Sequence, residues 1–350
     1  MFYTASDGSR FLNAEPKLFR LDIESREIQR LAADREHAVG DLRRSHDGRR
    51  LYFVSGMRTN RRLCSYDLED DRVEVLTRQD GTVLGFDVSP GGATLGLVFS
   101  DDSHLPELWT GTPDPYRAEP APKVNSLADE WLLGETRVER WRSRDGWEIE
   151  GLLTLPVEYR AGRRYPLMVV LHGGPHSAVT SALRPGYTDY NQVLAGRGWA
   201  VLRPNYRGGS NYGDLFAQGM DGDTGGGDFH DIMTGVDHLI DAGIADADRL
   251  GVMGWSWGGI STGWIVSHTD RFRAASAGAM VSNHFSVFGA ADLTYDVELF
   301  YIGGSPYANP SRYMSMSPIG HVMKAKTPTL LLHGMEDVRC PYPQSVEFYK

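Results

Sequence analysis

The most constraining feature of the sequence is a serine between glycines, in the motif Gly-Trp-Ser-Trp-Gly at residues 254–258. An apolar run at 250–253 precedes the motif, and a run compatible with a helix follows it at 260–268. This context predicts a tight strand-to-helix turn that holds the hydroxyl of Ser256 above a sheet. A side chain at Gly254 or Gly258 would crowd such a turn, which accounts for the spacing. A serine placed in this way is typical of a nucleophile, which needs an oxyanion site, an acid and a base.

Composition and charge are those of an ordinary globular protein. The 350 residues are 41% hydrophobic and 23% charged, and the length allows two domains. A net charge of -10 argues against nucleic acid as a partner. Cys64 and Cys340 lie far apart and offer no disulfide framework, which favours a reducing compartment. Because neither a signal peptide nor an apolar run of ~18 residues is visible, we expect a cytoplasmic protein without a membrane partner. The sequence is compatible with a homo-oligomer.

Residues 1–136 repeat with a period of 45 residues. Segments beginning with leucine at 18–22, 63–67 and 108–112 start 45 residues apart, and Leu31 and Leu76 keep the same offset. Several short strands in each unit of ~40–45 residues are typical of β-propeller blades. We therefore predict a partial β-propeller of about three blades over 1–136, with a plain antiparallel sandwich as the alternative. Closed propellers have roughly four to eight blades, so we expect further blades before Met1.

The periodicity changes near residue 137. Two strands are expected at 138–141 and 149–155. After them, short apolar runs alternate with helical segments, of which the clearest lies at 228–242. The apolar runs lie at 167–171, 199–202, 250–253 and 329–332. This alternation predicts an α/β fold class with a mostly parallel sheet covered on both faces over 137–350. Active sites of such sheets lie at the carboxyl ends of the strands. The residues expected there are His172, Asn205, Ser256 and Asp337.

The segment after the run at 167–171 is expected to form the oxyanion site. It begins His172-Gly173-Gly174, and paired glycines let the backbone approach a substrate with its N–H groups directed at a developing negative charge. The second donor is expected to be the backbone N–H of Trp257, the residue after the nucleophile. His172 precedes the serine in the chain, so we expect its ring to be structural.

The acid is expected on the loop that follows the last apolar strand. Asp337 lies 81 residues after Ser256 in this position. Its neighbour Glu336 is the alternative. Arg207 is expected at the border of the cleft, where it either binds a substrate carbonyl or carboxylate or braces the glycine-rich loop. Asp228 is expected to cap the N-terminus of the helix that follows it.

Taken together, these motifs resemble the prolyl oligopeptidase family of serine peptidases, nearest to its acylaminoacyl-peptidase and aminopeptidase-like branch. The resemblance extends over 138–350, and the motifs that carry it lie at 172–176, 204–213, 225–228, 254–259 and 333–341. It implies a propeller on an α/β-hydrolase domain, with short peptides as substrates and no cofactor or metal. It also implies Ser256 as the nucleophile, Asp337 as the acid, and the N–H groups of Gly174 and Trp257 as oxyanion donors. Thr224 and Cys340 depart from the family pattern, and we expect neither to touch the chemistry.

The base is the part of the triad that the sequence does not supply. Chain order in this fold is serine, acid, histidine, and the thirteen residues after Asp337 contain no histidine. His284 and His321 are the remaining candidates within the chain. The resemblance places the base beyond one more strand, so we expect a fragment whose hydrolase domain lacks its last strand, histidine loop and helix. Two alternatives remain: a carboxylesterase with the same machinery, and a catalytically inactive propeller scaffold.

Overall fold

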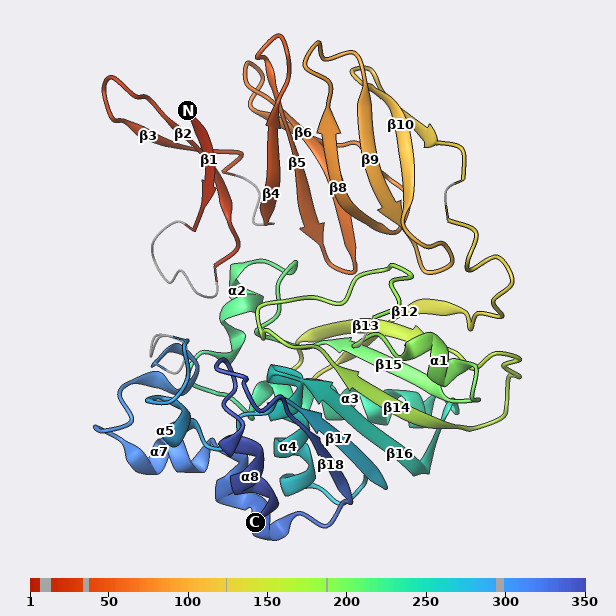
Figure 1. The fold of residues 1–350 in the computed structure, drawn as a ribbon, viewed down its shortest axis with the longest axis vertical. Helices are drawn as coiled ribbons and strands as arrows, with labels where there is room; N and C mark the ends of the chain where they lie inside the picture. The colour runs from red at the N-terminus through yellow and green to blue at the C-terminus, as the bar shows by residue number, and fades with distance from the viewer. Residues whose placement is uncertain (7–13, 34–37, 124, 187, 294–298) are drawn as a thin grey trace. The chain divides into compact units, whose positions relative to one another are not determined.

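The computed structural model describes residues 1–6, 14–33, 38–123, 125–186, 188–293 and 299–350, and the chain divides into two compact units. Unit 1 comprises Met1–Leu132, Thr180–Pro185 and Ser210–Ala217. Unit 2 comprises Leu133–Val179, Gly186–Gly209 and Gln218–Lys350. Figure 1 shows antiparallel strands in unit 1 and a sheet with helices in unit 2.

Unit 1 is built from successive antiparallel meanders. The first sheet contains β1 (Phe2–Ala5), β2 (Lys17–Leu21) and β3 (Ile28–Leu31). A second meander contains β4 (Val39–Arg44), β5 (Arg50–Met57), β6 (Asn60–Asp67) and β7 (Arg72–Val75), and a third contains β8 (Thr82–Val88), β9 (Leu95–Ser100), β10 (Glu107–Pro113) and β11 (Tyr116–Pro120). A single parallel pair, Arg61 with Thr82, joins the second meander to the third in one eight-stranded sheet.

The 45-residue repeat maps onto equivalent strands of these meanders. The three repeated segments fall on β2, β6 and β10. Strand β5 is buried on both faces: Leu51 and Phe53 belong to the core shared with β2 and β3, and Tyr52 and Val54 to the core shared with β8 and β9. Alternate side chains of a strand point to opposite faces, so the second meander packs against the first sheet on one face and against the third meander on the other. This stacking is that of propeller blades, and it confirms the expected partial propeller.

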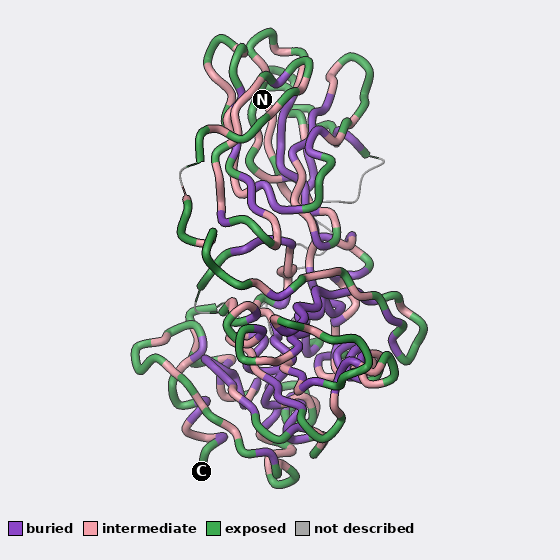
Figure 2. The backbone as a smooth tube through the Cα atoms, turned by 90° about the vertical axis from the view of Figure 1, so that its right-hand side faces the viewer, coloured by how far each residue is buried: buried purple, intermediate pink, exposed green. Residues whose placement is uncertain are grey.

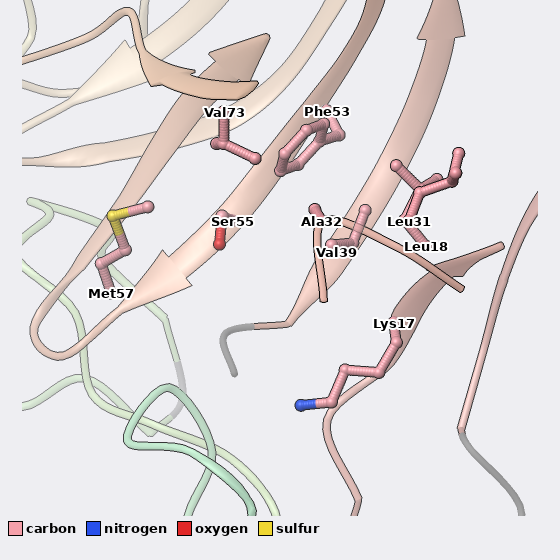
Figure 3. Close-up of a pocket in the computed structure, with 9 residues that line it drawn as sticks. All are labelled: Lys17, Leu18, Leu31, Ala32, Val39, Phe53, Ser55, Met57 and Val73. Carbon is pink, nitrogen blue, oxygen red and sulfur yellow. The ribbon is translucent and has the colours of Figure 1, made fainter. Parts of the chain in front are cut away.

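The core around β2, β3 and β5 contains a small void. It measures about 20 Å³, which is room for about one water molecule. Its lining is apolar apart from Lys17 and Ser55. Figure 3 shows the ammonium of Lys17 directed away from the other lining side chains, and its Nζ pairs with Asp214 at 3.1 Å. The void is therefore a packing defect of the core.

Two segments of the second half of the sequence pack in unit 1. Ser181 donates its backbone N–H to Thr59 O at 2.8 Å, and its own carbonyl accepts from the Thr82 hydroxyl at 2.7 Å. In the other segment, the backbone N–H of Asn211 donates to Glu15 Oε1 at 2.5 Å. Burial raises the pKa of Glu15 to about 7. That segment also contains the short helix α2 (Asp214–Ala217).

Unit 2 contains a seven-stranded mixed sheet. In spatial order the strands are β12 (Thr136–Arg142), β13 (Glu148–Thr154), β15 (Ala200–Asn205), β14 (Tyr165–Leu171), β16 (Ala245–Trp255), β17 (Ala274–Gly278) and β18 (Thr329–Leu332). The strands from β15 to β18 are parallel, and β12 and β13 pair antiparallel to their neighbours. Every residue of β15 is buried, as expected for a central strand covered on both faces. Figure 2 shows buried segments in the interior of each unit.

Helical segments connect and cover these strands. They are α1 (Asn191–Ala195), η2 (Gln218–Met220), α3 (Gly227–Asp241), α4 (Trp257–His268), α5 (His284–Val287), η3 (Leu299–Gly303), α7 (Pro310–Ser315), η4 (Pro318–Lys324) and α8 (Pro343–Tyr349). Helix α4 contacts β14, β16, β17 and η4 and is buried along nearly its whole length.

The order of the sheet reverses direction at β14, with β15 on one side and β16 on the other. A ligand crevice is expected at such a switch point, beyond the carboxyl ends of the strands. Across the described parts of the chain, no helix is both long and apolar enough to cross a membrane.

Candidate active site

Ser256 occupies a strained turn between β16 and α4. Its backbone has φ 57° and ψ −121°, a conformation that non-glycine residues rarely adopt. The turn is held on both sides, because the Ser256 N–H donates to Gly278 O at 2.9 Å and its carbonyl accepts from Ile260 N at 3.0 Å. This is the geometry of a nucleophile elbow, which lifts the serine hydroxyl off the end of the sheet.

The glycines around the serine are required by close backbone contacts. A Cβ at Gly254 would lie 2.4 Å from the carbonyl group of Gly258, and one at Gly259 would lie 2.3 Å from Gly278 O. A Cβ at Gly258 would lie 2.1 Å from Leu171 O, at the end of β14. The structural explanation expected for the glycine spacing is therefore confirmed. The contacts also lock α4 against the carboxyl ends of three strands.

The loop at 172–174 passes directly beside the serine. A Cβ at Gly173 would lie 3.3 Å from Ser256 Cβ and 3.8 Å from Ser256 Oγ. The next residue, Gly174, has a φ of 129°, which a glycine adopts without steric cost. At the other side of the elbow, Trp257 begins α4, where backbone N–H groups have no partner within the helix. The structure thus brings together the two segments expected to supply oxyanion donors.

His172 is a partly buried residue whose ring is held by its neighbours. Its ring stacks on that of Tyr206 at 4.3 Å, and its Nδ1 lies 2.9 Å from Gly173 O. The Tyr206 hydroxyl donates to His172 O at 2.6 Å. Burial lowers the pKa of His172 to about 4, so the ring is neutral near pH 7. The ring and its partners fix the loop that carries Gly173, in agreement with the structural role expected for this histidine.

Asp337 lies on the loop between β18 and α8. Its Oδ1 accepts hydrogen bonds from the backbone N–H groups of Arg339 and Cys340, both at 2.9 Å. Its Oδ2 lies 3.9 Å from His333 Nε2. The side chain of Asp337 is half-buried, whereas its rival Glu336 is exposed. The carboxylate at 337 is therefore the better fixed of the two.

Cys340 connects the acid loop to the elbow. Burial raises the pKa of its thiol to about 11, and the side chain of Ser256 has a smaller, opposite effect on this pKa. The thiol therefore lies near the nucleophile, and the expectation that Cys340 does not touch the chemistry stays a prediction. Sequence signals could not show this proximity. The second departure from the family pattern, Thr224, is buried and donates to Tyr301 O at 3.0 Å.

The described histidines near the site contact groups other than the Ser256 hydroxyl. His333 is held by Ser345 Oγ at 2.6 Å and Cys340 O at 2.5 Å. His284 is buried, with its ring 6.4 Å from that of Trp257. His321 contacts Ser315 O at 2.8 Å. His37 lies outside the described residues. Within the described ranges no hydrogen bond joins the hydroxyl of Ser256 to a histidine.

Arg207 is a brace in this structure. Its guanidinium makes bidentate contacts with buried Asp231, at 2.9 and 2.7 Å, and with Asp145, at 2.7 and 2.9 Å. It also lies over the ring of Trp147 at 4.5 Å. These contacts engage all three guanidinium nitrogens, so of the two roles considered for Arg207 the geometry favours bracing. The pairing lowers the pKa of Asp145 to about 2.

Asp228 does not cap the helix that follows it. Helix α3 begins at Gly227 with Gly226 as its N-cap, which places Asp228 inside the first turn. Its side chain is buried, and its Oδ1 has no hydrogen-bond partner among the described groups. Burial is the main cause that raises the pKa of Asp228 to about 7. The expectation of an N-cap is wrong by two residues, because the glycine run at 225–227 starts the helix earlier.

The fold and the elbow together define an α/β-hydrolase with an N-terminal β-propeller. The model of the prolyl oligopeptidase family matches residues 186–350. An uncharacterized peptidase of Bacillus subtilis is 36% identical over 214 residues, which cover 60% of this chain and 32% of that protein. The human acylamino-acid-releasing enzyme is 28% identical over 335 residues, covering 87% of this chain and 44% of the enzyme.

Solved structures agree with these sequence matches. The acylaminoacyl peptidase of Pyrococcus horikoshii superposes with a TM-score of 0.88 at 25% identity, over 99% of this chain and 54% of that one. A puromycin hydrolase superposes with a TM-score of 0.80 at 23% identity, which shows a shared fold. Over residues 186–350 the chain is thus similar to the prolyl oligopeptidase family. It spans less than half of the length of the curated relatives that it matches.

Proposed function

We propose that this chain carries the nucleophile of a serine peptidase that hydrolyses short peptides, in the manner of an acylaminoacyl peptidase or an aminopeptidase. The observation that carries the proposal is the backbone of Ser256, which has φ 57° and lies beside Gly173 at the switch point of the sheet. The names of the relatives support a peptide substrate. The human relative is named for releasing acylated amino acids, and a solved acylaminoacyl peptidase holds a peptide chloromethyl ketone.

In the proposed reaction, Ser256 Oγ attacks the carbonyl carbon of the scissile bond and loses its proton to a base. The negative oxygen of the tetrahedral intermediate accepts hydrogen bonds from the backbone N–H groups of Gly174 and Trp257. The protonated base then gives its proton to the leaving amine, and a water molecule hydrolyses the acyl-enzyme. Asp337 orients the base and stabilises its charged form. Each step uses side chains, backbone groups and water, so the proposal assigns no role to a metal or cofactor.

We propose that the base is a histidine other than the eleven of this chain. The support is the placement of the candidates, because His333 is held by Ser345 and Cys340, and His321 contacts Ser315. Without a base, a triad enzyme retains only about 10³–10⁴-fold catalysis over water. The 350-residue chain is therefore expected to turn over acyl-alanine anilides slowly.

The domain assignment accompanies this proposal. We assign 1–136 to the partial propeller and 137–350 to the catalytic domain, although the segments 180–185 and 210–217 pack with the propeller sheets. A reducing compartment such as the cytoplasm suits the two cysteines, which are free and buried. Short peptides are the proposed partners, and neither nucleic acid nor a membrane has a role in the proposed reaction.

Labelling by a fluorophosphonate probe tests the nucleophile. We expect slow labelling of the 350-residue chain at Ser256, located by mass spectrometry, and an increase on adding imidazole as an external base. Ser256→Ala should abolish the labelling, whereas Ser261→Ala, which alters a serine one turn along α4, should leave it. Labelling at another serine would contradict the proposal for Ser256. Brisk labelling without imidazole would instead show that a base within the chain serves.

A comparison of substrates tests the peptidase assignment separately. With imidazole present, a peptidase site should release the anilide from an acyl-alanine anilide in proportion to the labelled Ser256. Turnover of short-chain esters alone would indicate a carboxylesterase. If neither substrate is turned over by the chain that labels, the proposed peptidase activity does not belong to residues 1–350.

A further inference from the structure

Two histidine rings lie against each other where α4 meets η4 in unit 2. His268 is the last residue of α4, and His321 lies in η4, which packs against that helix. Their ring centres are 4.4 Å apart, with an angle of 55° between the ring planes. His268 is exposed and His321 is partly buried, so a small ion can reach both. The proposed peptidase reaction makes no use of this pair.

The indole of Trp264 supports both rings. It stacks on the ring of His268 with 3.9 Å between the centres, and the ring of His321 meets it edge-on at 5.2 Å. The indole is itself closely packed, because a Cβ at Gly225 would lie 2.4 Å from it. The two histidines are therefore held by a fixed side chain of the same helix.

One nitrogen of each ring donates to a backbone carbonyl. His268 Nδ1 lies 2.8 Å from Trp264 O, and His321 Nε2 lies 2.8 Å from Ser315 O. A carbonyl oxygen only accepts hydrogen bonds, so each of these nitrogens carries the hydrogen, and the other nitrogen of a neutral ring has the lone pair. Histidines that bind metal ions commonly donate their second N–H to a carbonyl in this way.

The nitrogens with the lone pairs are His268 Nε2 and His321 Nδ1. Within the described parts of the chain, the hydrogen bonds of these two side chains use only the opposite nitrogens. Burial lowers the pKa of His268, and the nearby His321 and Lys324 act in the same direction, so this ring is neutral near pH 7. A neutral imidazole is the form that binds a metal ion.

The spacing of the rings suits a shared ion. A metal bound at about 2.1 Å to each nitrogen lies about 3.2 Å from each ring centre, and two nitrogens at right angles then put the ring centres about 4.5 Å apart. The observed separation is 4.4 Å. Among the described residues no group of three histidines, cysteines or carboxylates could hold a metal. The pair therefore supplies two ligands, and water completes the coordination.

We propose that His268 Nε2 and His321 Nδ1 together bind a late first-row transition metal ion, such as Zn²⁺ or Cu²⁺. Imidazole suits these ions, whereas Mg²⁺ and Ca²⁺ prefer oxygen ligands. The ion links the end of α4 to η4. Because the unfolded chain does not hold the two rings together, binding also stabilises the folded state of unit 2.

Isothermal titration of the 350-residue chain with ZnCl₂ tests the affinity and the stoichiometry. We expect one equivalent of Zn²⁺ to bind through the pair, without competition from MgCl₂. His268→Gln and His321→Gln should each weaken this binding at least about tenfold, because each leaves a single imidazole. His46→Gln is the matched control, since His46 is an exposed histidine whose Nδ1 also contacts a carbonyl, Pro90 O at 2.8 Å. It should leave the binding unchanged.

The double variant separates a shared ion from two independent sites. If one ion contacts both rings, His268→Gln and His321→Gln combined should lose little more affinity than either alone, because each single change already breaks the chelate. Two equivalents of Zn²⁺, of which each single variant loses one, would show two separate sites and overturn the proposal. Binding that neither variant weakens would also overturn it.

Pulsed electron paramagnetic resonance counts the ligands in the unaltered chain, so this test does not depend on the folding of a variant. With less than one equivalent of Cu²⁺, we expect modulation from two imidazoles in the parent and in His46→Gln. His268→Gln and His321→Gln should each show at most one. A single imidazole in the parent, or two that persist in both variants, would contradict the shared site. Neither readout involves Ser256, so the result is independent of the peptidase proposal.

Discussion

The carbonyl oxygen of Leu171 lies only 2.1 Å from the position that a Cβ would take at Gly258. The last residue of β14 and the second residue of α4 are thus in direct backbone contact, although 87 positions separate them in the sequence. This contact sets the distance between the loop that begins at His172 and the turn that carries Ser256. It makes the spacing of the glycines a requirement of the tertiary structure as well as of the local turn.

Gly258→Ala should therefore destabilise unit 2. The added methyl group meets a backbone carbonyl, which cannot rotate away as a side chain can, so we expect a loss of about 3 kcal/mol in the free energy of unfolding. Urea denaturation measures it. Gly289→Ala is the matched control, because a Cβ there meets no atom within 4 Å. Equal stability of the two variants would show that the contact is relaxed in solution.

Arg207→Lys should separate a structural brace from a substrate-binding role. Lysine keeps the charge but loses the two bidentate contacts with Asp231 and Asp145, and we expect a loss of about 2–3 kcal/mol in unfolding free energy. Arg249→Lys alters an exposed pair with Asp246 and should change stability by less than about 0.5 kcal/mol. A variant that kept full stability would contradict the brace.

Asp228 should make stability depend on pH near neutrality. Its pKa of about 7 in the folded state lies above that of an unfolded aspartate, about 3.9. The folded state therefore holds the proton more tightly, and stability present at pH 4 is lost as pH rises to 7 and above. We expect a fall on the order of 1–3 kcal/mol between pH 5 and pH 8 from this group.

Asp228→Asn is the variant that isolates this contribution. The amide cannot ionise, so the slope of the urea midpoint against pH should decrease in the variant. Glu15, whose pKa is also raised to about 7, acts in the same direction and remains in both proteins. Asp248→Asn, at an exposed site, should retain the slope of the parent. An unchanged slope in Asp228→Asn would show that Asp228 titrates below this range.

Both thiols should react slowly in the folded chain. Cys64 and Cys340 are buried, and a pKa of about 11 leaves Cys340 about 10⁻³ ionised at pH 8. We expect its reaction with Ellman's reagent to be at least about 100-fold slower than that of free cysteine. In urea both thiols should react at once, and Cys340→Ala assigns the two signals. Rapid modification of native Cys340 would show that the acid loop opens beside Ser256.

Local patterns were sufficient to predict much of this architecture. Four apolar runs in the second half correspond to β14, β15, β16 and β18, and the helix expected at 228–242 is α3 to within one residue at each end. The 45-residue repeat placed β2, β6 and β10 in equivalent positions. Such features are readable because side-chain periodicity, glycine turns and chain order are properties of neighbouring residues.

The tertiary structure alone decided which distant residues meet. The turn at Ser256 and the glycines around it followed from the sequence, because a strained strand-to-helix turn tolerates few residues at those positions. The sequence did not predict three other features of the site. These are the position of the Cys340 thiol near Ser256, the two carboxylates around Arg207 and the buried oxygen of Asp228 that has no hydrogen-bond partner. Nor did it predict the packing of 180–185 and 210–217 with the propeller sheets. These contacts join segments tens to hundreds of residues apart, and their geometry depends on how complete strands and helices pack, which no local pattern records.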